Sequence, residues 1–267
     1  MTVAFRLSGS LDVEDIRFDV LWQRGCLGLQ QDGEEVVAYF QHRVDLPVAG
    51  RWDDLPEIDY LEAYQHSLSP VRLERLVIAP THRRVVVHAG QRPLWLDPGR
   101  AFGTGHHETT RMALRALESL DLVGSRVLDI GSGSGILTIA ADLLGASYAH
   151  GVDTDPVAVS VAEENAVMNA SRATFEVGSL PLIGCTPPFD VVVGNLYAEL
   201  HCSLMPHYPG VLAPGGRLLL TGILGEHSCL VIDTLPHELE LLSVRVDSQW
   251  VLLEIRRAMG AQAQLSG

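Results

Sequence analysis

Val127-Leu128-Asp129-Ile130-Gly131-Ser132-Gly133-Ser134-Gly135 is the clearest indication in the sequence of how this chain folds. Its apolar first half is typical of a buried strand, and its glycines predict a tight turn that lets the backbone approach a ligand closely. Gly151-Val152-Asp153 follows one helix-length later and places an acid 22 residues after Gly131. Nucleotide-binding βαβ units hold the acceptor for a ribose hydroxyl at about this distance, roughly 20 residues on. The sequence therefore predicts a nucleoside site at the edge of a parallel sheet.

The glycine spacing narrows the choice of ligand. The pattern is G-x-G-x-G, whereas the dinucleotide fingerprint is G-x-G-x-x-G. This departure favours a ligand that has a nucleoside but no pyrophosphate, such as S-adenosylmethionine.

The region from about residue 93 to 257 alternates apolar strand-like and helix-like segments, which predicts an α/β fold with a parallel sheet and right-handed crossovers. Strands are expected at 126–130, 149–153, 174–177, 190–194 and 217–221, and helices at 108–120, at 136–144 and from Pro156 onward. Two further strands, 239–246 and 249–255, read as a hairpin. A late antiparallel strand fits a seven-stranded methyltransferase sheet better than a dehydrogenase.

The first third of the chain reads differently. Residues 1–55 predict a small α+β unit, with strands at 3–7 and 36–41 and a helix at 12–23. A linker helix is expected at 56–70, and the larger domain at 71–257 begins with strands at 73–78 and 84–88. Residues 258–267 are expected to be disordered.

Composition and charge limit the partners. The chain has 267 residues, 47% of them hydrophobic, and a net charge of −14 that disfavours a nucleic acid substrate and favours a basic protein partner. Residues 1–70 hold five arginines against 13 acids, so this segment is the better candidate for docking a positive partner, with ordinary solubility as the alternative. No apolar run is long enough to span a membrane, and the N-terminus has no signal-peptide pattern. We expect a cytoplasmic monomer.

A second polar cluster, residues 97–110, precedes the strand expected at 126–130 and contains three glycines, two histidines and three threonines. Its glycines permit a segment around Phe102, Gly103 and Thr104 to close over a ligand. Thr109 or Thr110 at the start of a helix can bind a carboxylate, which the helix N-terminus also favours. The alternative is an irregular loop with a helix cap. The adjacent histidines lack the spacing of a helical metal pair, so no metal site is expected.

A third cluster, Asn195-Leu196-Tyr197, follows the strand expected at 190–194. Ligands of open α/β sheets bind at the carboxyl ends of strands. An asparagine there can accept hydrogen bonds from an amine and so aim the lone pair of the amine at a methyl group. Asn195 and Tyr197 are therefore the candidate catalytic residues, although a turn asparagine is the alternative. Asp129 faces either the ammonium group of the cofactor or a structural hydrogen-bond donor.

Four motifs carry a resemblance to a known family: LDPGRAFGTGHHETT, DIGSGSG, GVDTDP and NLYAELH. They closely resemble the ribosomal protein L11 methyltransferases (PrmA) from about Asp97 to Ile223. The N-terminal likeness is weaker: the family tends to have tryptophans where this chain has Tyr60 and Tyr64.

The resemblance implies a class I methyltransferase domain with a Rossmann-like seven-stranded sheet, preceded by a ferredoxin-like substrate-recognition domain and a linker. It implies methylation of ribosomal protein L11 on its α-amine and lysine ε-amines, up to trimethylation, with S-adenosylmethionine as cofactor and S-adenosylhomocysteine as product. Residues expected to contact the cofactor, from the motifs and the resemblance together, are Phe102, Gly103, Thr104, Thr110, Asp129, Gly131, Gly133, Asp153 and Asn195.

Three alternatives stay open at this point. A methyltransferase acting on nucleic acid or glutamine would favour Asn-Pro-Pro-aromatic, whereas Leu196 follows Asn195 here. A nicotinamide-dependent dehydrogenase would need a pyrophosphate turn and a catalytic acid/base. A non-catalytic binding module would not need the complete set of cofactor motifs. We interpret Asn195 as an orienter rather than a base; His106, His107 or Glu108 could pass the proton to water.

Overall fold

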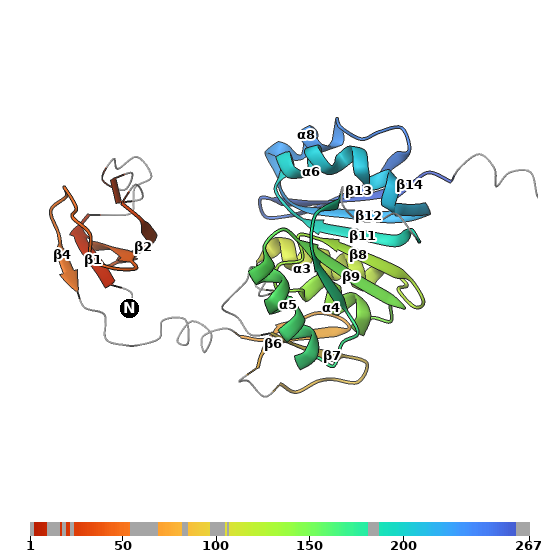
Figure 1. Cartoon of the computed structure of the whole chain (residues 1–267), viewed down its shortest axis with the longest axis horizontal. Helices are drawn as coiled ribbons and strands as arrows, with labels where there is room; N and C mark the ends of the chain where they lie inside the picture. The colour runs from red at the N-terminus through yellow and green to blue at the C-terminus, as the bar shows by residue number, and fades with distance from the viewer. Residues whose placement is uncertain are drawn as a thin grey trace, which may run out of the picture. The chain divides into compact units, whose positions relative to one another are not determined.

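The computed structural model of the chain describes residues 3–9, 17, 20–21, 24–53, 69–81, 85–96, 105, 107–180 and 187–259. The chain divides into two compact units, Met1–His66 and Ser67–Gly267 (Figure 1). The predicted linker helix at 56–70 and disordered tail at 258–267 lie almost entirely outside the described residues, as does most of the predicted helix at 12–23.

The N-terminal unit contains an antiparallel sheet with the order β2-β3-β1-β4. Its strands are β1 (Val3–Ser8), β2 (Cys26–Asp32), β3 (Glu35–Phe40) and β4 (Arg51–Asp53). One face is apolar, with Phe5 and Trp52 in ring contact at 5.1 Å. On the strands of this sheet Arg6 binds Asp32 and Asp53, each at 2.6 Å.

The two strands predicted in this unit are confirmed within a residue or two, but β2 and β4 were not predicted. The strand order is that of a ferredoxin-like sheet, but residues 41–50, which join β3 to β4, contain no helix. The ferredoxin-like assignment therefore stays a prediction.

The C-terminal unit is built on a seven-stranded sheet with the order β10-β9-β8-β11-β12-β14-β13. Its strands are β8 (Arg126–Ile130), β9 (Tyr148–Asp153), β10 (Thr174–Val177), β11 (Phe189–Asn195), β12 (Leu212–Leu224), β13 (Leu239–Asp247) and β14 (Trp250–Arg257). The first five are parallel, and β14 runs antiparallel to both β12 and β13. This topology confirms the predicted Rossmann-like sheet and its terminal hairpin.

Helices cover this sheet on both faces, and alternation along the strands separates two cores. Val127, Val191 and Val193 belong to one core with residues of the first two helices, whereas Leu128 and Val192 belong to the other. The helices are α3 (Glu108–Ser119), α4 (Ile136–Leu143), α5 (Pro156–Met168), α6 (Ala198–Leu204), α7 (Tyr208–Val211) and α8 (Ser228–Ile232). Figure 1 shows α6 and α8 beside β12 to β14, away from α4 and α5.

A three-stranded sheet, β5 (Val71–Arg72), β6 (Leu76–Pro80) and β7 (Arg92–Leu96), precedes the large one. The strand predicted at 73–78 is wrong in its first half, because a turn separates β5 from β6. The buried carboxylate of Glu118 holds this turn by accepting the N–H groups of Glu74, Arg75 and Leu76 at 2.8–3.2 Å.

The strand predicted at 84–88 is also wrong: residues 85–88 are irregular and mostly exposed, and the strand lies at β7 instead. Asn169, at the end of α5, fastens β7 by exchanging two 2.7 Å hydrogen bonds with the backbone of Trp95. Among the described residues, no helix is long and apolar enough to cross a membrane.

Candidate functional site

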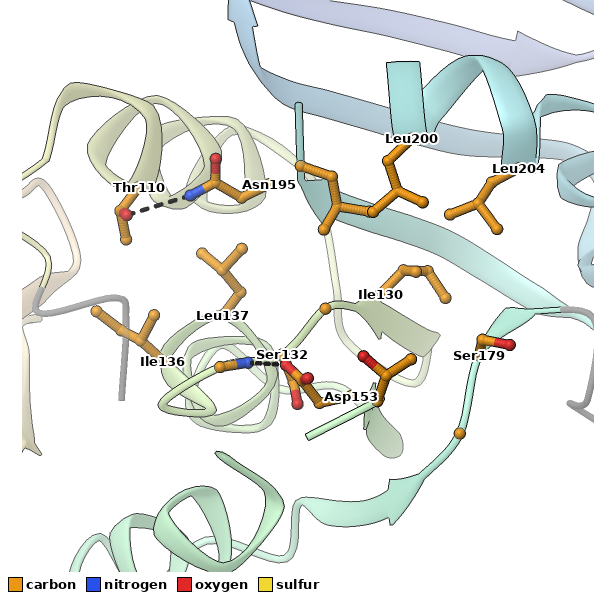
Figure 2. Close-up of a pocket in the computed structure, with 15 residues that line it drawn as sticks. Thr110, Ile130, Ser132, Ile136, Leu137, Asp153, Ser179, Asn195, Leu200 and Leu204 are labelled. Carbon is orange, nitrogen blue, oxygen red and sulfur yellow. Dashed lines mark hydrogen bonds between the residues drawn. The ribbon is translucent and has the colours of Figure 1, made fainter. Parts of the chain in front are cut away.

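A cavity of about 260 Å³ opens at the carboxyl ends of β8, β9, β10 and β11 (Figure 2). This is the edge of the sheet at which the sequence places its ligand. The residues that line the cavity are Thr110, Ile130, Gly131, Ser132, Gly133, Ile136, Leu137, Asp153, Thr154, Gly178, Ser179, Asn195, Leu196, Leu200 and Leu204.

The glycine turn between β8 and α4 forms the floor of the cavity. Gly131 has a φ of 72°, and a Cβ atom there would lie 2.5 Å from Leu196 Cδ2. Gly135 caps α4 at a φ of 79°, where a Cβ would lie 2.9 Å from Ala162 Cβ. At positive φ a side chain would be strained, and at both positions its Cβ would need neighbouring atoms to shift, so glycine is strongly favoured there.

Asp153, at the end of β9, is fixed by the turn that it faces. Its Oδ2 accepts the N–H of Gly133 at 2.8 Å, and its Oδ1 accepts the N–H of Asp155 at 3.0 Å. Each carboxylate oxygen offers two lone pairs, so both oxygens keep an acceptor position for hydroxyl groups in the cavity. Asp153 is thus pre-oriented as an acceptor, as the spacing from Gly131 predicts.

Asn195 and Thr110 come from two different elements and lie side by side at one edge of the cavity (Figure 2). Thr110 lies in the first turn of α3, and Asn195 ends β11. The Asn195 Nδ2 atom donates to Thr110 Oγ1 at 3.3 Å (Figure 2). One of the two N–H groups of this amide goes to Thr110, and the nitrogen can only donate, so Oδ1 is the atom that can accept a hydrogen bond from a bound molecule.

Five of the predicted site residues are brought together in the cavity: Thr110, Gly131, Gly133, Asp153 and Asn195. Phe102, Gly103 and Thr104 lie outside the described residues. Tyr197 is 61% exposed at the N-cap of α6 and does not line the cavity.

Asp129 does not line the cavity either, because strand alternation turns it to the other face of the sheet from Ile130. It is almost fully buried, and its Oδ2 accepts a 2.8 Å hydrogen bond from the Thr138 hydroxyl of α4. Its Oδ1 has no hydrogen-bond partner among the described residues. Burial raises the pKa of Asp129 to about 7. These contacts support the structural reading of this residue.

The buried carboxyl group of Asp129 predicts a pH effect on stability. Its pKa rises from 3.8 to about 7, so the folded chain binds more protons than the unfolded chain between these values. The free energy of unfolding therefore falls as pH rises through this window. We expect Asp129→Asn, which cannot ionise, to gain stability relative to the wild type from pH 5 to pH 8 in urea unfolding without cofactor. The same difference at both pH values would contradict this.

Several cavity residues were missed at the level of sequence. Gly178 and Ser179 follow β10 and obey the same carboxyl-end rule as Asn195, so applying the rule to every strand finds them. Leu200 and Leu204 are one helical turn apart on α6, and this spacing indicates that they share one apolar face of the helix. Ser132 lies between Gly131 and Gly133 in the glycine turn, but no role was predicted for it.

The cavity suits a nucleoside joined to an amino acid. Ser132 is 5% exposed, and its Oγ has no hydrogen-bond partner among the described residues, so it is available to a polar ligand group. Asp153 supplies acceptors for hydroxyl groups, the start of α3 favours a carboxylate, and Ile130 with Leu200 supplies apolar surface. Within the described residues, no group of three or more His, Cys, Asp or Glu side chains could hold a metal ion.

The sheet order, the glycine turn and the spaced acid define a Rossmann-like methyltransferase domain. The family model of ribosomal protein L11 methyltransferase (PrmA) matches residues 23–258. The chain belongs to this family, and it is an enzyme that transfers methyl groups with S-adenosylmethionine as cofactor.

Relatives and solved structures agree. A ribosomal protein L11 methyltransferase of Deinococcus radiodurans is 43% identical, covering 96% of this chain and 99% of the relative. That of Thermus thermophilus is 44% identical, covering 95% and 99%. The crystal structure of a ribosomal protein L11 methylase from Lactobacillus delbrueckii subsp. bulgaricus matches with a TM-score of 0.66 and 31% identity, over 72% of this chain and all of that one.

Proposed function

We propose that this enzyme methylates ribosomal protein L11 on its α-amine and on lysine ε-amines, up to trimethylation. The observation that carries the amine chemistry is the Asn195 amide, which Thr110 holds with Oδ1 available as an acceptor at the cavity. The assignment of L11 as the protein substrate rests on the relatives named above.

The residues of the cavity divide the binding of the cofactor among them. Asp153 would accept hydrogen bonds from the ribose hydroxyls, and the backbone of Gly131 and Gly133, which lines the cavity, would hold the amino-acid portion. Thr110 and the N-terminus of α3 would bind its carboxylate. When bound, the cofactor would supply a methyl group attached to a sulfonium. Transfer of this methyl group leaves a neutral thioether, so the protein needs no acid to assist the leaving group.

The enzyme must hold the substrate amine in its neutral form next to this methyl group. Free lysine has a pKa of about 10.4 and an α-amine about 7.7–8.0. Removal of water around the amine lowers its pKa, because burial disfavours the charged form. Asn195 Oδ1 then accepts an N–H and aligns the lone pair, and alignment of this kind is worth up to about 7–11 kcal/mol.

The proton is lost to water rather than to a dedicated base. His107 is engaged with Thr109, whose backbone and hydroxyl both contact its Nδ1, and it therefore acts as the cap of α3. Exposed Tyr197 lies next to the turn that holds Asn195 and guides the incoming amine.

The acidic N-terminal segment selects the substrate. Residues 1–70 carry 13 acids against five arginines, which suits a basic ribosomal protein. The enzyme acts in the cytoplasm as a monomer and does not bind nucleic acid directly.

Deleting residues 1–55 is expected to abolish methylation of intact L11 while S-adenosylmethionine still binds, because the cavity lies wholly within the second unit. Calorimetry of cofactor binding serves as the control for folding. Retained activity on the intact partner would refute this role.

The direct test is mass spectrometry of purified L11 after incubation with the enzyme and S-adenosylmethionine. Gains in steps of one methyl group, mapped to the N-terminus and to lysines, are the expected result. No gain, although the cofactor binds, would move the substrate assignment to another basic protein.

A further inference from the structure

A buried histidine lies directly behind the turn that carries Asn195. His201 is in α6, its exposed fraction is 0%, and it does not line the cavity. Its Nε2 lies 2.9 Å from the Thr221 carbonyl oxygen, and its Nδ1 lies 3.1 Å from the Tyr208 hydroxyl. The proposed reaction gives this residue no task.

The bond to Thr221 links His201 to the turn after β11. The Thr221 carbonyl also accepts the N–H of Leu196 at 2.9 Å, so one oxygen holds both the turn and the imidazole. His201 also packs under β11, since a Cβ atom on Gly194 would lie 3.2 Å from its ring. A displacement of the ring therefore acts on the two residues on either side of Asn195.

The hydrogen bonds define one state of the imidazole. A carbonyl oxygen can only accept, so Nε2 carries the proton and donates to Thr221. Burial lowers the pKa of His201 to about 4, which keeps the ring neutral and leaves Nδ1 as the acceptor for the Tyr208 hydroxyl. Tyr208 is fully buried, and burial raises its pKa, so it remains a donor.

The far side of the turn is equally close-packed. Gly222 has a φ of 82°, and a Cβ atom there would lie 2.6 Å from the Leu196 carbonyl oxygen and 2.9 Å from Asn195 Oδ1. The turn thus has little room to shift between β12 and α6. The hydrogen bond from His201 fixes the Thr221 carbonyl, which accepts the Leu196 N–H of this turn.

We infer that His201, oriented by Tyr208, is a positioning residue that fixes the Asn195–Leu196 turn through the Thr221 carbonyl. This inference rests on the proposed role of Asn195. The alternative is a histidine that contributes only to the stability of the core.

Four variants of the full chain separate the two. His201→Gln keeps a donor near the position of Nε2, His201→Asn loses it, and Tyr208→Phe removes only the partner of Nδ1. Val231→Ala shortens a fully buried residue of the same core, in α8, and serves as the matched control for stability. Each is measured for single-turnover methylation of L11, for cofactor Kd, for Tm and for hydrogen exchange of the Leu196 amide.

His201→Asn is expected to lower the single-turnover rate about 10- to 100-fold and to speed exchange at Leu196, because a shift of about 1 Å in a positioned group costs that much. Tyr208→Phe should show a smaller loss, and His201→Gln should restore most of the rate. Cofactor Kd should change little. Equal rate losses in His201→Asn and Val231→Ala at equal Tm, or unchanged exchange at Leu196, would overturn the inference.

The exchange measurement needs no protein substrate. If the wild type fails to methylate L11 but Leu196 exchange still rises in His201→Asn, the proposed function fails while the positioning role is supported.

Discussion

Asn195→Ala is expected to lower the rate of methyl transfer about 100-fold, since the amine would lose the acceptor that aligns it. Cofactor Kd should change by no more than about tenfold, because one hydrogen bond between neutral groups is worth only about 0.5–1.5 kcal/mol. Single-turnover kinetics and cofactor titration measure the two effects separately.

A second asparagine provides the matched control. Asn169 ties Trp95 to α5 and does not line the cavity, so Asn169→Ala should lower stability but leave the single-turnover rate near that of the wild type. Equal losses of rate and cofactor affinity in Asn195→Ala would show that this residue binds the cofactor rather than orients the amine.

Asp153→Ala is expected to raise the cofactor Kd about 100-fold or more. Each hydrogen bond to a charged group is worth about 1.5–3 kcal/mol, and two ribose hydroxyls would lose theirs. The variant also frees the N–H of Gly133, so the glycine turn loses one of its anchors.

Calorimetric titration with S-adenosylmethionine checks this, with Asp155→Ala as control. Asp155 carries the same charge two residues away but caps α5 and does not line the cavity, so its loss should leave the Kd nearly unchanged. A Kd that rises equally in both variants would point to a general charge effect and contradict the ribose assignment.

Much of the large domain could be predicted, because its buried parallel strands consist of nearly continuous runs of apolar residues. The strand at 126–130 and the helix that starts at Pro156 lie where the sequence places them. The edge strands of the two smaller sheets were harder to predict. β7 contains Pro93, which argues against a strand except at an edge, and β2 contains two glutamines, an aspartate and a glycine. Three consecutive valines, 85–87, carry strand propensity but are irregular in the structure.

The site was predictable to the extent that its residues follow strand ends. Asn195 and Asp153 obey that rule. Asp129 does not, because its place inside β8 directs it toward Thr138, and only the phase of the strand relative to the helices decides this. The role of His201 could not be read from the sequence, since its partners Tyr208 and Thr221 come from elements whose packing is three-dimensional.

The small sheet that precedes the large one sets where the catalytic unit can be cut. Leu76, Ile78, Leu94 and Leu96 belong to the same core as Leu114 and Leu117 of α3, and Glu118 holds the turn before β6. The recognisable motifs begin only at Asp97, but a polypeptide started there would leave this apolar surface open to water and prone to aggregation. An isolated catalytic domain should therefore begin near Ser67.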